Sequence, residues 1–377
     1  MRKFVGFVLG VFLLLSSLSV SVSALGISSR CGVLMEQQTG RVMYEKCADE
    51  PMYIASITKI LTALIAIEET DLDVWVEIDE EIIQQVGSSL YLIAGDEMKL
   101  SDLLYGLMLR SGNDAALAIA RHVGGSEADF ATMMNERAAE IGMENSMFQN
   151  ASGLDETTYN LSTARDMALL QRYAMNHPIF REISGTVQHR ATSRGGKVFV
   201  WRNKHRMVRG SYEYAVSGKT GYTEEARRTL VTSARQDDME LVVVTIKAGD
   251  DWNDHRRLFE YGFANYETRR IVQVGELDIA MDIADALPSG WRLFVRDEIN
   301  VFVRTDGSED VKVNLAIAGD VLREQVGFLQ VLVDETVFDE VPVYKLDTTF
   351  HRRLEIAPAF SRFLGWFRGE YEHLLSN

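Results

Sequence analysis

The chain has 377 residues, of which 46% are hydrophobic and 25% charged, and its formal net charge is −16. This composition excludes a disordered chain and a protein with several membrane spans, and the acidic balance excludes the basic face of a nucleic-acid-binding protein. The chain has only two cysteines and seven histidines, which excludes a cysteine-rich zinc site. Its length predicts two domains.

The first 24 residues have the features of a secretory signal peptide. Two basic residues precede an apolar run over 4–18, and Val22 and Ala24 are small residues at the −3 and −1 positions of a cleavage site. We expect 1–24 to be removed, which takes the net charge to −18. The mature protein is then exported to the outer face of the cytoplasmic membrane or the cell-wall space; an uncleaved anchor is the alternative.

A β-hairpin is predicted at the start of the mature chain. Segments 32–37 and 41–46 flank a turn in which Gly40 takes the left-handed position. In this register residue i faces residue 78 minus i, which places Cys31 opposite Cys47. We expect a cross-strand disulfide because exported proteins meet oxidising conditions; two buried free thiols are the alternative.

The first of three short motifs follows the hairpin. Residues 55–69 are apolar on most faces and predict a buried helix, with Ser56 and Lys59 near its start. Residues three apart share one face of a helix, so a lysine whose pKa is lowered by desolvation can take the proton of the serine. Alone, this S-x-x-K motif also fits a serine cap followed by a solvated lysine.

The middle of the chain predicts helices first and strands later. Residues 101–185 are mostly helical: one helix starts at 101, and helical spacing marks 114–123, 128–141 and 163–175. Strand patterns mark 189–193, 197–201, 228–234 and 240–247, and a closing helix covers 256–263. This order indicates an α+β fold in which helices pack against an antiparallel sheet whose first strands come from the N-terminal hairpin.

Two further motifs fall within these elements. Ser-Gly-Asn at 111–113 lies between two helical stretches and offers a hydroxyl and an amide; an ordinary helix–helix turn is its other interpretation. Lys219, Thr220 and Gly221 enter a predicted strand and offer a second positive charge, a hydroxyl for a carboxylate and room for a substrate backbone. An edge strand with one charge is the other interpretation.

After a first domain over 25–268, short strands separated by turns predict a small all-β domain over 269–346. The strand-like segments are 291–303, 311–317 and 328–333. The tail over 347–377 has aromatic residues and leucines at helical spacing, which predicts an amphipathic helix over 359–375 lying on the membrane surface. Docking of this helix on the β domain is the alternative.

Taken in order, S-x-x-K, S-x-N and K-T-G form the motif set of β-lactamases and penicillin-binding proteins. The sequence resembles the D-alanyl-D-alanine carboxypeptidases among the low-molecular-mass penicillin-binding serine peptidases over about 27–346. The segments that carry the resemblance are 35–45, 55–63, 111–116, 134–154, 162–168 and 261–263. It implies a β-lactamase/transpeptidase-like fold, removal of the terminal D-alanine of peptidoglycan stem peptides, acylation by β-lactams, and no metal or organic cofactor.

The resemblance also implies roles for the motif residues in catalysis. Ser56 is then the nucleophile that becomes acylated, and Lys59 is its general base. Ser111 relays protons.

The remaining motif residues are then substrate-binding residues. Asn113 holds the substrate, while Lys219 and Thr220 meet its carboxylate. Gly221 lets the substrate backbone approach the strand, and the backbone N–H of Tyr222 forms an oxyanion hole with that of the nucleophile.

Two departures from the family pattern stand out. Segment 226–230 replaces a commoner Ala-Gly-x-Cys-Leu and resembles a branch associated with endospore cortex modification, so sporulation is a candidate setting. An arginine that some members carry near the end of the catalytic domain falls at Asp251 here, so the cation that completes the carboxylate site stays open. The candidates are Arg227, Arg228, Arg256 and Arg257, each of which also fits a surface or structural charge.

Three other functions stay open: a β-lactamase, a D,D-endopeptidase, and a non-catalytic cell-wall-binding protein. A class A β-lactamase requires a deacylating carboxylate in a Glu-x-x-Leu-Asn motif, which the sequence lacks. The presence of all three motifs disfavours a non-catalytic protein.

Overall fold

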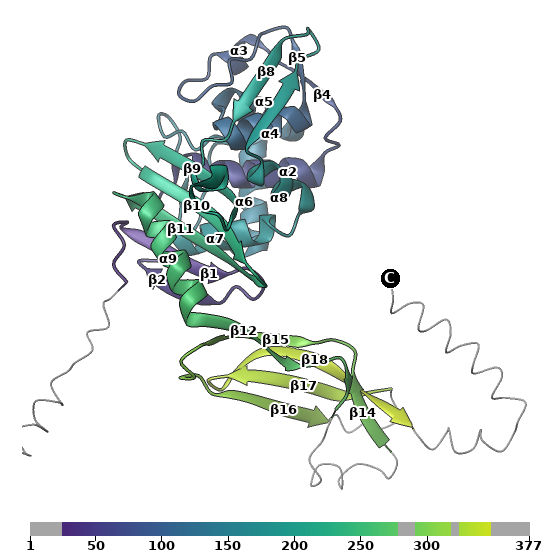
Figure 1. Cartoon of the computed structure of the whole chain (residues 1–377). Coiled ribbons are helices and arrows are strands. Elements are labelled where there is room, and N and C mark those ends of the chain that lie inside the picture. The colour runs from purple at the N-terminus through teal and green to yellow at the C-terminus, as the bar shows by residue number, and fades with distance from the viewer. Residues whose placement is uncertain (1–24, 278–290, 318–323, 348–377) are drawn as a thin grey trace, which may run out of the picture. The chain divides into compact units, whose positions relative to one another are not determined.

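The computed structural model describes residues 25–277, 291–317 and 324–347 (Figure 1). The predicted signal peptide and the predicted amphipathic tail helix lie outside the described residues. The chain divides into two compact units that meet between Phe263 and Ala264. The sequence places this boundary after 268; the structure places it earlier because strand β12 (Tyr266–Val272) pairs with β15 (Ile299–Arg304) of the second unit.

A five-stranded antiparallel sheet forms the centre of the first unit, in the order β2-β1-β11-β10-β9. Its strands are β1 (Cys31–Glu36), β2 (Val42–Lys46), β9 (Ala215–Thr223), β10 (Arg227–Gln236) and β11 (Met239–Ala248). The N-terminal hairpin pairs with β11, which confirms that the first strands of the sheet come from the start of the chain. β9 is an edge strand of this sheet, and it carries the third motif.

Helices cover both faces of the sheet (Figure 1). The helix predicted over 55–69 contains α2 (Lys59–Glu69), and the helical region predicted over 101–185 contains α4 (Leu100–Arg110), α5 (Asn113–Gly124), α6 (Glu127–Ile141), α7 (Ala164–Ala174) and α8 (Pro178–Gly185). The short helix α3 (Glu80–Ile83) lies in a stretch for which the sequence predicts no helix. Val242 and Val244 of β11 join the core that these helices build. The residue next along the strand, Thr245, bonds to His255 of α9 (Asp251–Asn265), so α9 covers the other face.

Three short ladders complete the first unit. They pair β3 (Met52–Tyr53) with β6 (Leu161–Ser162), β4 (Trp75–Glu77) with β5 (Glu97–Lys99), and β7 (Gln188–Thr192) with β8 (Val198–Arg202). The five-residue π-helical turn η2 (Met207–Ser211) precedes β9. The strands predicted at 189–193, 197–201, 228–234 and 240–247 are confirmed apart from their ends.

The N-terminal hairpin follows the predicted register only in part. Gly32 pairs with Lys46 and Leu34 with Tyr44, as the rule requires, but a bulge after Leu34 pairs Met35 with Val42. Gly40 has φ of +76°, which confirms its left-handed position in the turn. The regular part of the hairpin lies next to the two cysteines, which are both free thiols in the structure.

The second unit is built from strands, as the sequence predicts. Its sheet has the order β13-β14-β18-β17-β16, with β13 (Gly275–Glu276), β14 (Trp291–Val295), β16 (Val311–Ile317), β17 (Gln325–Val333) and β18 (Thr336–Asp347). The stretch predicted as strand over 291–303 forms two strands, β14 and β15, which belong to different sheets. Buried side chains such as Val295, Val301 and Val331 give this unit its own core.

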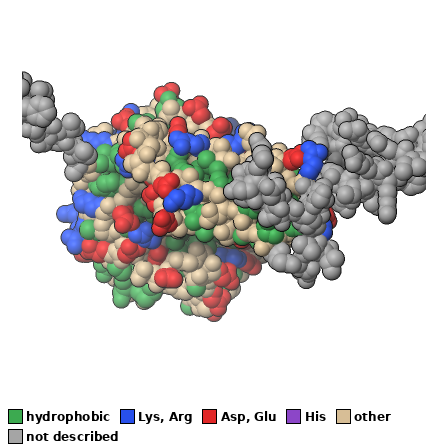
Figure 2. All heavy atoms as spheres, turned by 90° about the horizontal axis from the view of Figure 1, so that it is seen from below, with side chains coloured by type: hydrophobic (Ala, Val, Ile, Leu, Met, Phe, Trp, Pro, Cys, Tyr) green, Lys and Arg blue, Asp and Glu red, His purple; other side chains and the backbone are tan. Residues whose placement is uncertain are grey.

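Two further observations concern the described helices and the charge on one face of the molecule. None of its described helices is both long and apolar enough to cross a membrane. Acidic and basic side chains are interspersed over the face drawn in Figure 2, so the negative net charge of the chain does not form a single acidic patch there.

Candidate active site

The three motifs meet in one cleft of the first unit. Its volume is about 630 Å³, and its lining consists of Ser56, Ser88, Ser111, Lys204, Thr220, Gly221, Tyr222, Arg228, Asp251 and Trp252. The lining comes from a helical turn, a helix–helix junction, strand β9 and the start of α9, which are far apart in the sequence. The structure therefore brings together the residues that the sequence analysis selected, together with several that it did not.

The first motif does not lie on one continuous helix. Ala55–Thr58 forms a 3-10 turn, η1, and α2 begins only at Lys59. Ala55 has φ of 50°, and Gly153 packs so closely against it that a Cβ on Gly153 would lie 2.0 Å from the carbonyl oxygen of Ala55. This packing fixes the turn that carries Ser56.

Lys59 is a fully buried lysine beside the serine hydroxyl. Its Nζ lies 3.0 Å from Ser56 Oγ, 2.8 Å from Asn113 Oδ1 and 2.5 Å from the carbonyl oxygen of Ser152. Burial, together with the positive charge of Lys204, lowers the pKa of Lys59 to about 7. A large fraction of such a lysine is uncharged at neutral pH, so it can accept the proton of Ser56.

A second buried lysine contacts the second serine. Lys219 Nζ donates to Ser111 Oγ at 2.9 Å and to the carbonyl of Thr220 at 2.7 Å. Burial and the charge of Lys59 lower the pKa of Lys219 well below its usual value. Ser111 ends α4 in a left-handed conformation, with φ of 65°, and it is this turn that presents its hydroxyl to β9.

Asn113 is held in place by the loop before α4. Its Nδ2 donates to the carbonyl of Val86 and its backbone N–H to the carbonyl of Ser88, both at 2.7 Å. The neighbouring carboxylate of Asp114 is buried and accepts from the backbone N–H of Leu90 at 2.8 Å. The amide oxygen of Asn113 is thus aimed at Lys59 before any substrate binds.

The segment after α6 holds the η1 turn and the start of α2 in place through hydrogen bonds. Asn160 Nδ2 donates to Thr58 Oγ1 at 3.1 Å, and Thr62 Oγ1 donates to the carbonyl of Ala151 at 2.7 Å. The sequence analysis did not select Ser152 as a site residue. Because Ser152 contributes its backbone carbonyl to Lys59, no side-chain pattern signals it.

Strand β9 lies directly against the η1 turn that carries Ser56. A Cβ on Gly221 would lie 3.0 Å from the backbone nitrogen of Ser56 and 2.3 Å from Thr229 Oγ1, so this position has space only for glycine. Thr229 in turn donates to the carbonyl of Ile54 at 2.9 Å. Tyr222, the next residue of β9, is 60% exposed at the rim of the cleft.

Of the four arginines that the sequence left open, Arg228 is the one that lines the cleft. Its Nη1 lies 3.3 Å from Asp251 Oδ1, and Asp251 is a buried residue at the start of α9. Arg256 instead donates to the carbonyl of Ser211, and Arg257 to that of Gly26.

Lys204 is a second cation of the lining, and the sequence analysis missed it. Its Nζ donates to Ser88 Oγ at 2.9 Å. The side chain as a whole is exposed, but atoms packed around its ammonium group, together with the charge of Arg110, lower its pKa. No motif surrounds Lys204, so only its place beside the cleft reveals it.

The fold and this arrangement define a serine peptidase of the penicillin-binding type. Residues 18–250 match the peptidase S11 family, D-alanyl-D-alanine carboxypeptidase, and the chain belongs to this family. It is a serine-type D-Ala-D-Ala carboxypeptidase, which confirms the function predicted from the sequence. Membership implies a peptidoglycan peptide as substrate, binding of β-lactams, and work outside the cytoplasm.

Individual relatives agree with this assignment. D-alanyl-D-alanine carboxypeptidase DacF of Bacillus subtilis is 28% identical over 336 residues, which cover 85% of this chain and 86% of the relative. DacC of Escherichia coli is 33% identical over 264 residues, covering 66% of this chain and 64% of the relative. The crystal structure of DacD from Francisella tularensis has a TM-score of 0.67 at 22% identity, covering 85% of this chain and 93% of that one, which confirms the α+β fold.

Proposed function

We propose that Ser56 is the acylated nucleophile and Lys59 its general base. The observation that carries this proposal is the buried Nζ of Lys59 at 3.0 Å from Ser56 Oγ, with a pKa of about 7. The uncharged amine takes the serine proton, and Oγ attacks the carbonyl of the penultimate D-alanine. The terminal D-alanine leaves as an amine, and water then hydrolyses the ester.

Charge that develops on the carbonyl oxygen is stabilised by the backbone N–H groups of Ser56 and Tyr222. The closeness of β9 to the turn that carries Ser56 supports this assignment, because a Cβ on Gly221 would lie only 3.0 Å from the backbone nitrogen of Ser56. Ser111 relays a proton to the leaving amine, since its hydroxyl is within hydrogen-bond reach of Lys219.

The free carboxylate of the substrate binds at the β9 side of the cleft. Lys219 and Thr220 provide the first contacts, and Arg228 completes the site, with Lys204 adding positive charge at the rim. Support for Arg228 comes from its place in the lining and from its ion pair with Asp251, which orients the guanidinium. The substrate backbone pairs along the edge of β9, where Gly221 has no side chain to obstruct it.

A pentapeptide ending in D-Ala-D-Ala tests this mechanism most directly. The wild-type enzyme should release one alanine per peptide, and labelled penicillin should attach covalently to the peptide containing Ser56. Ser56→Ala should abolish both. A wild-type protein that takes up no label, or a Ser56→Ala variant that still releases alanine, would contradict the proposal; cleavage of cross-linked muropeptides in a parallel assay would reveal endopeptidase activity.

We further propose that the protein is exported after removal of 1–24 and contacts the membrane through 359–375, with vegetative wall or spore cortex as its setting. The sequence features of these segments support the first two points, and segment 226–230 supports a sporulation role. A chain truncated after Pro358 should leave the membrane fraction. If it fractionates with membranes as the full chain does, the tail is not the anchor.

A further inference from the structure

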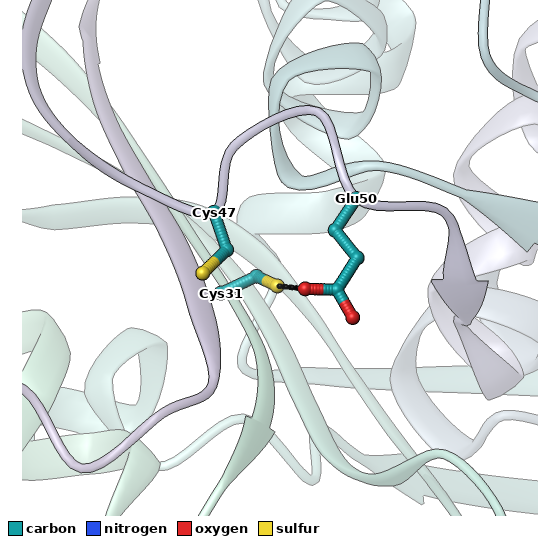
Figure 3. A group of neighbouring side chains, drawn as sticks. All are labelled: Cys31, Cys47 and Glu50. Atoms are coloured by element: carbon teal, nitrogen blue, oxygen red, sulfur yellow. Dashed lines mark hydrogen bonds between the residues drawn. The ribbon is translucent and has the colours of Figure 1, made fainter.

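Two thiols and a carboxylate lie together at the open end of the N-terminal hairpin (Figure 3). Cys31 Sγ, Cys47 Sγ and a carboxylate oxygen of Glu50 are all within 4.8 Å of one another. Cys31 Sγ also lies 3.4 Å from Met52 Sδ and 4.0 Å from Glu50 Oε2. None of these residues lines the catalytic cleft, so the cluster is separate from the site described above.

The strand register brings the two cysteines into opposition. Gly32 pairs with Lys46, and Cys31 and Cys47 are the next residues outward on the two chains. Cys47 lies just past the end of β2, where its φ is 45°, and its Sγ lies within 4.8 Å of Cys31 Sγ, so the two sulfurs are already close to each other. A bond between them therefore requires side-chain rotation and no rearrangement of the sheet.

The two thiols differ in access. Cys31 is buried and Cys47 is exposed. Burial raises the pKa of Cys31 to about 12, and the negative charge of Glu50 adds to the shift. A protonated, buried thiol reacts slowly with reagents in solution, so an external oxidant reaches Cys47 first.

We propose that Cys31 and Cys47 are an oxidation site that closes into an intramolecular disulfide outside the cell. The oxidant is a disulfide compound or disulfide-carrying protein of that space. The sulfur of Cys47 attacks it and releases one thiol, leaving a mixed disulfide on Cys47. The sulfur of Cys31 then attacks Cys47 Sγ and releases the second thiol, so the two hydrogens of the protein thiols end on the two released thiols.

The same three ligand atoms could instead hold a thiophilic metal ion. Arg30 disfavours this occupant, because its guanidinium already binds Glu50 through Nε and Nη2 at 3.0 and 2.8 Å to Oε1 and at 3.1 Å to Oε2. A metal ion would place a second positive charge on the same carboxylate. A disulfide requires no change at Glu50, so the contacts favour the disulfide.

The bond would join β1 to the segment that leads into the nucleophile turn. That segment runs from Cys47 through β3 to Ser56, and the Arg30–Glu50 ion pair and the Cys31–Met52 contact already tie it to β1. Closing the loop from 31 to 47 restricts the unfolded chain, so the oxidised protein should unfold about 5–10 °C above the reduced one.

Intact mass of the exported full chain tests the proposal. The protein is purified without reductant, incubated with oxidised glutathione, unfolded and treated with iodoacetamide. We expect no alkyl group without prior reduction and two after it, and a non-reduced digest should contain one peptide pair joined through Cys31 and Cys47. The Cys31→Ser/Cys47→Ser double variant should unfold at the temperature of the reduced wild-type protein.

Three outcomes would overturn the proposal. The first is alkylation of both thiols after incubation with oxidised glutathione. The second is a dimer linked through Cys47 with Cys31 free. The third is zinc or copper bound in equal amount to the untreated protein and lost in Cys47→Ser, which would assign the cluster to a metal. The mass readout uses the wild-type chain, so it does not depend on how well any variant folds.

Discussion

The cleft contains two lysine–serine pairs that are built in different ways. Lys59 and Ser56 are three positions apart, at the junction of a 3-10 turn and a helix, whereas Lys219 and Ser111 are 108 positions apart and connect β9 to the end of α4. The first pair depends on local chain geometry and the second on the packing of sheet against helices. We infer that the local pair performs the nucleophilic attack. In the long-range pair, Lys219 and its neighbouring cations bind the substrate carboxylate, while Ser111 relays the proton to the leaving amine.

Breaking the local pair should have the largest effect. Lys59→Arg keeps the positive charge but removes a base that can be uncharged near neutral pH, so alanine release and penicillin acylation should both fall about 10³-fold. Steady-state hydrolysis of the pentapeptide and a penicillin-labelling time course measure this. Lys204→Arg is the matched control and should retain most activity; an active Lys59→Arg enzyme would show that charge, not proton transfer, is what matters at this position.

On the sheet side, Arg228→Leu should weaken substrate binding. Loss of a charge-assisted contact to the carboxylate should lower kcat/KM about 10- to 100-fold, mainly through a higher KM. Arg256→Leu provides the control, because Arg256 bonds to the carbonyl of Ser211 outside the cleft lining. If kcat falls and KM does not change, Arg228 does not act through substrate binding, and the proposed separation of roles between the two lysine–serine pairs is wrong.

Asp251→Asn should have a smaller effect that depends on Arg228. The neutral amide orients the guanidinium less firmly, so kcat/KM should fall about threefold to tenfold. In the Arg228→Leu background the same change should cost nothing further, since there is no guanidinium left to orient. Equal effects of Asp251→Asn in both backgrounds, measured as kcat/KM, would mean that Asp251 acts independently of Arg228.

The smallest expected effect is a shift in the pH dependence of acylation. Because Lys59 acts in its uncharged form, acylation should rise with pH through a midpoint near its pKa of about 7. The charge of Lys204 lowers that pKa, so Lys204→Met should move the midpoint to higher pH. Penicillin acylation rates between pH 5 and 9 measure the shift; a midpoint that stays in place or moves down would show that the charge of Lys204 does not act on the base.

The contrast between local and long-range contacts also explains which site residues could be predicted from the sequence. Ser56, Lys59, Ser111 and Lys219 belong to short motifs whose order along the chain is informative, and the structure brings them together in one cleft. Lys204 has no motif, and Ser152 takes part through its backbone, so neither left a signal in the sequence.

Other features depended on pairings that sequence spacing does not reveal. Choosing Arg228 among four arginines required knowing that β10 runs beside β9 and that α9 begins with Asp251. The split of the first motif between two elements required the contact of Gly153 with Ala55, which lies far away in the sequence. Similarly, the bulge after Leu34 changed the hairpin register at Met35, because side-chain alternation alone cannot reveal one extra residue in a strand.

The close packing of Gly153 on the nucleophile turn has a consequence for the lifetime of the acyl-enzyme. A serine whose backbone is already fixed presents the same geometry to a flexible peptide and to a rigid β-lactam ring, so neither has to reshape the turn to react. The difference between the peptide substrate and the β-lactam must then arise after acylation. The released D-alanine can diffuse away and give water its place, whereas the opened ring stays attached and keeps that place filled.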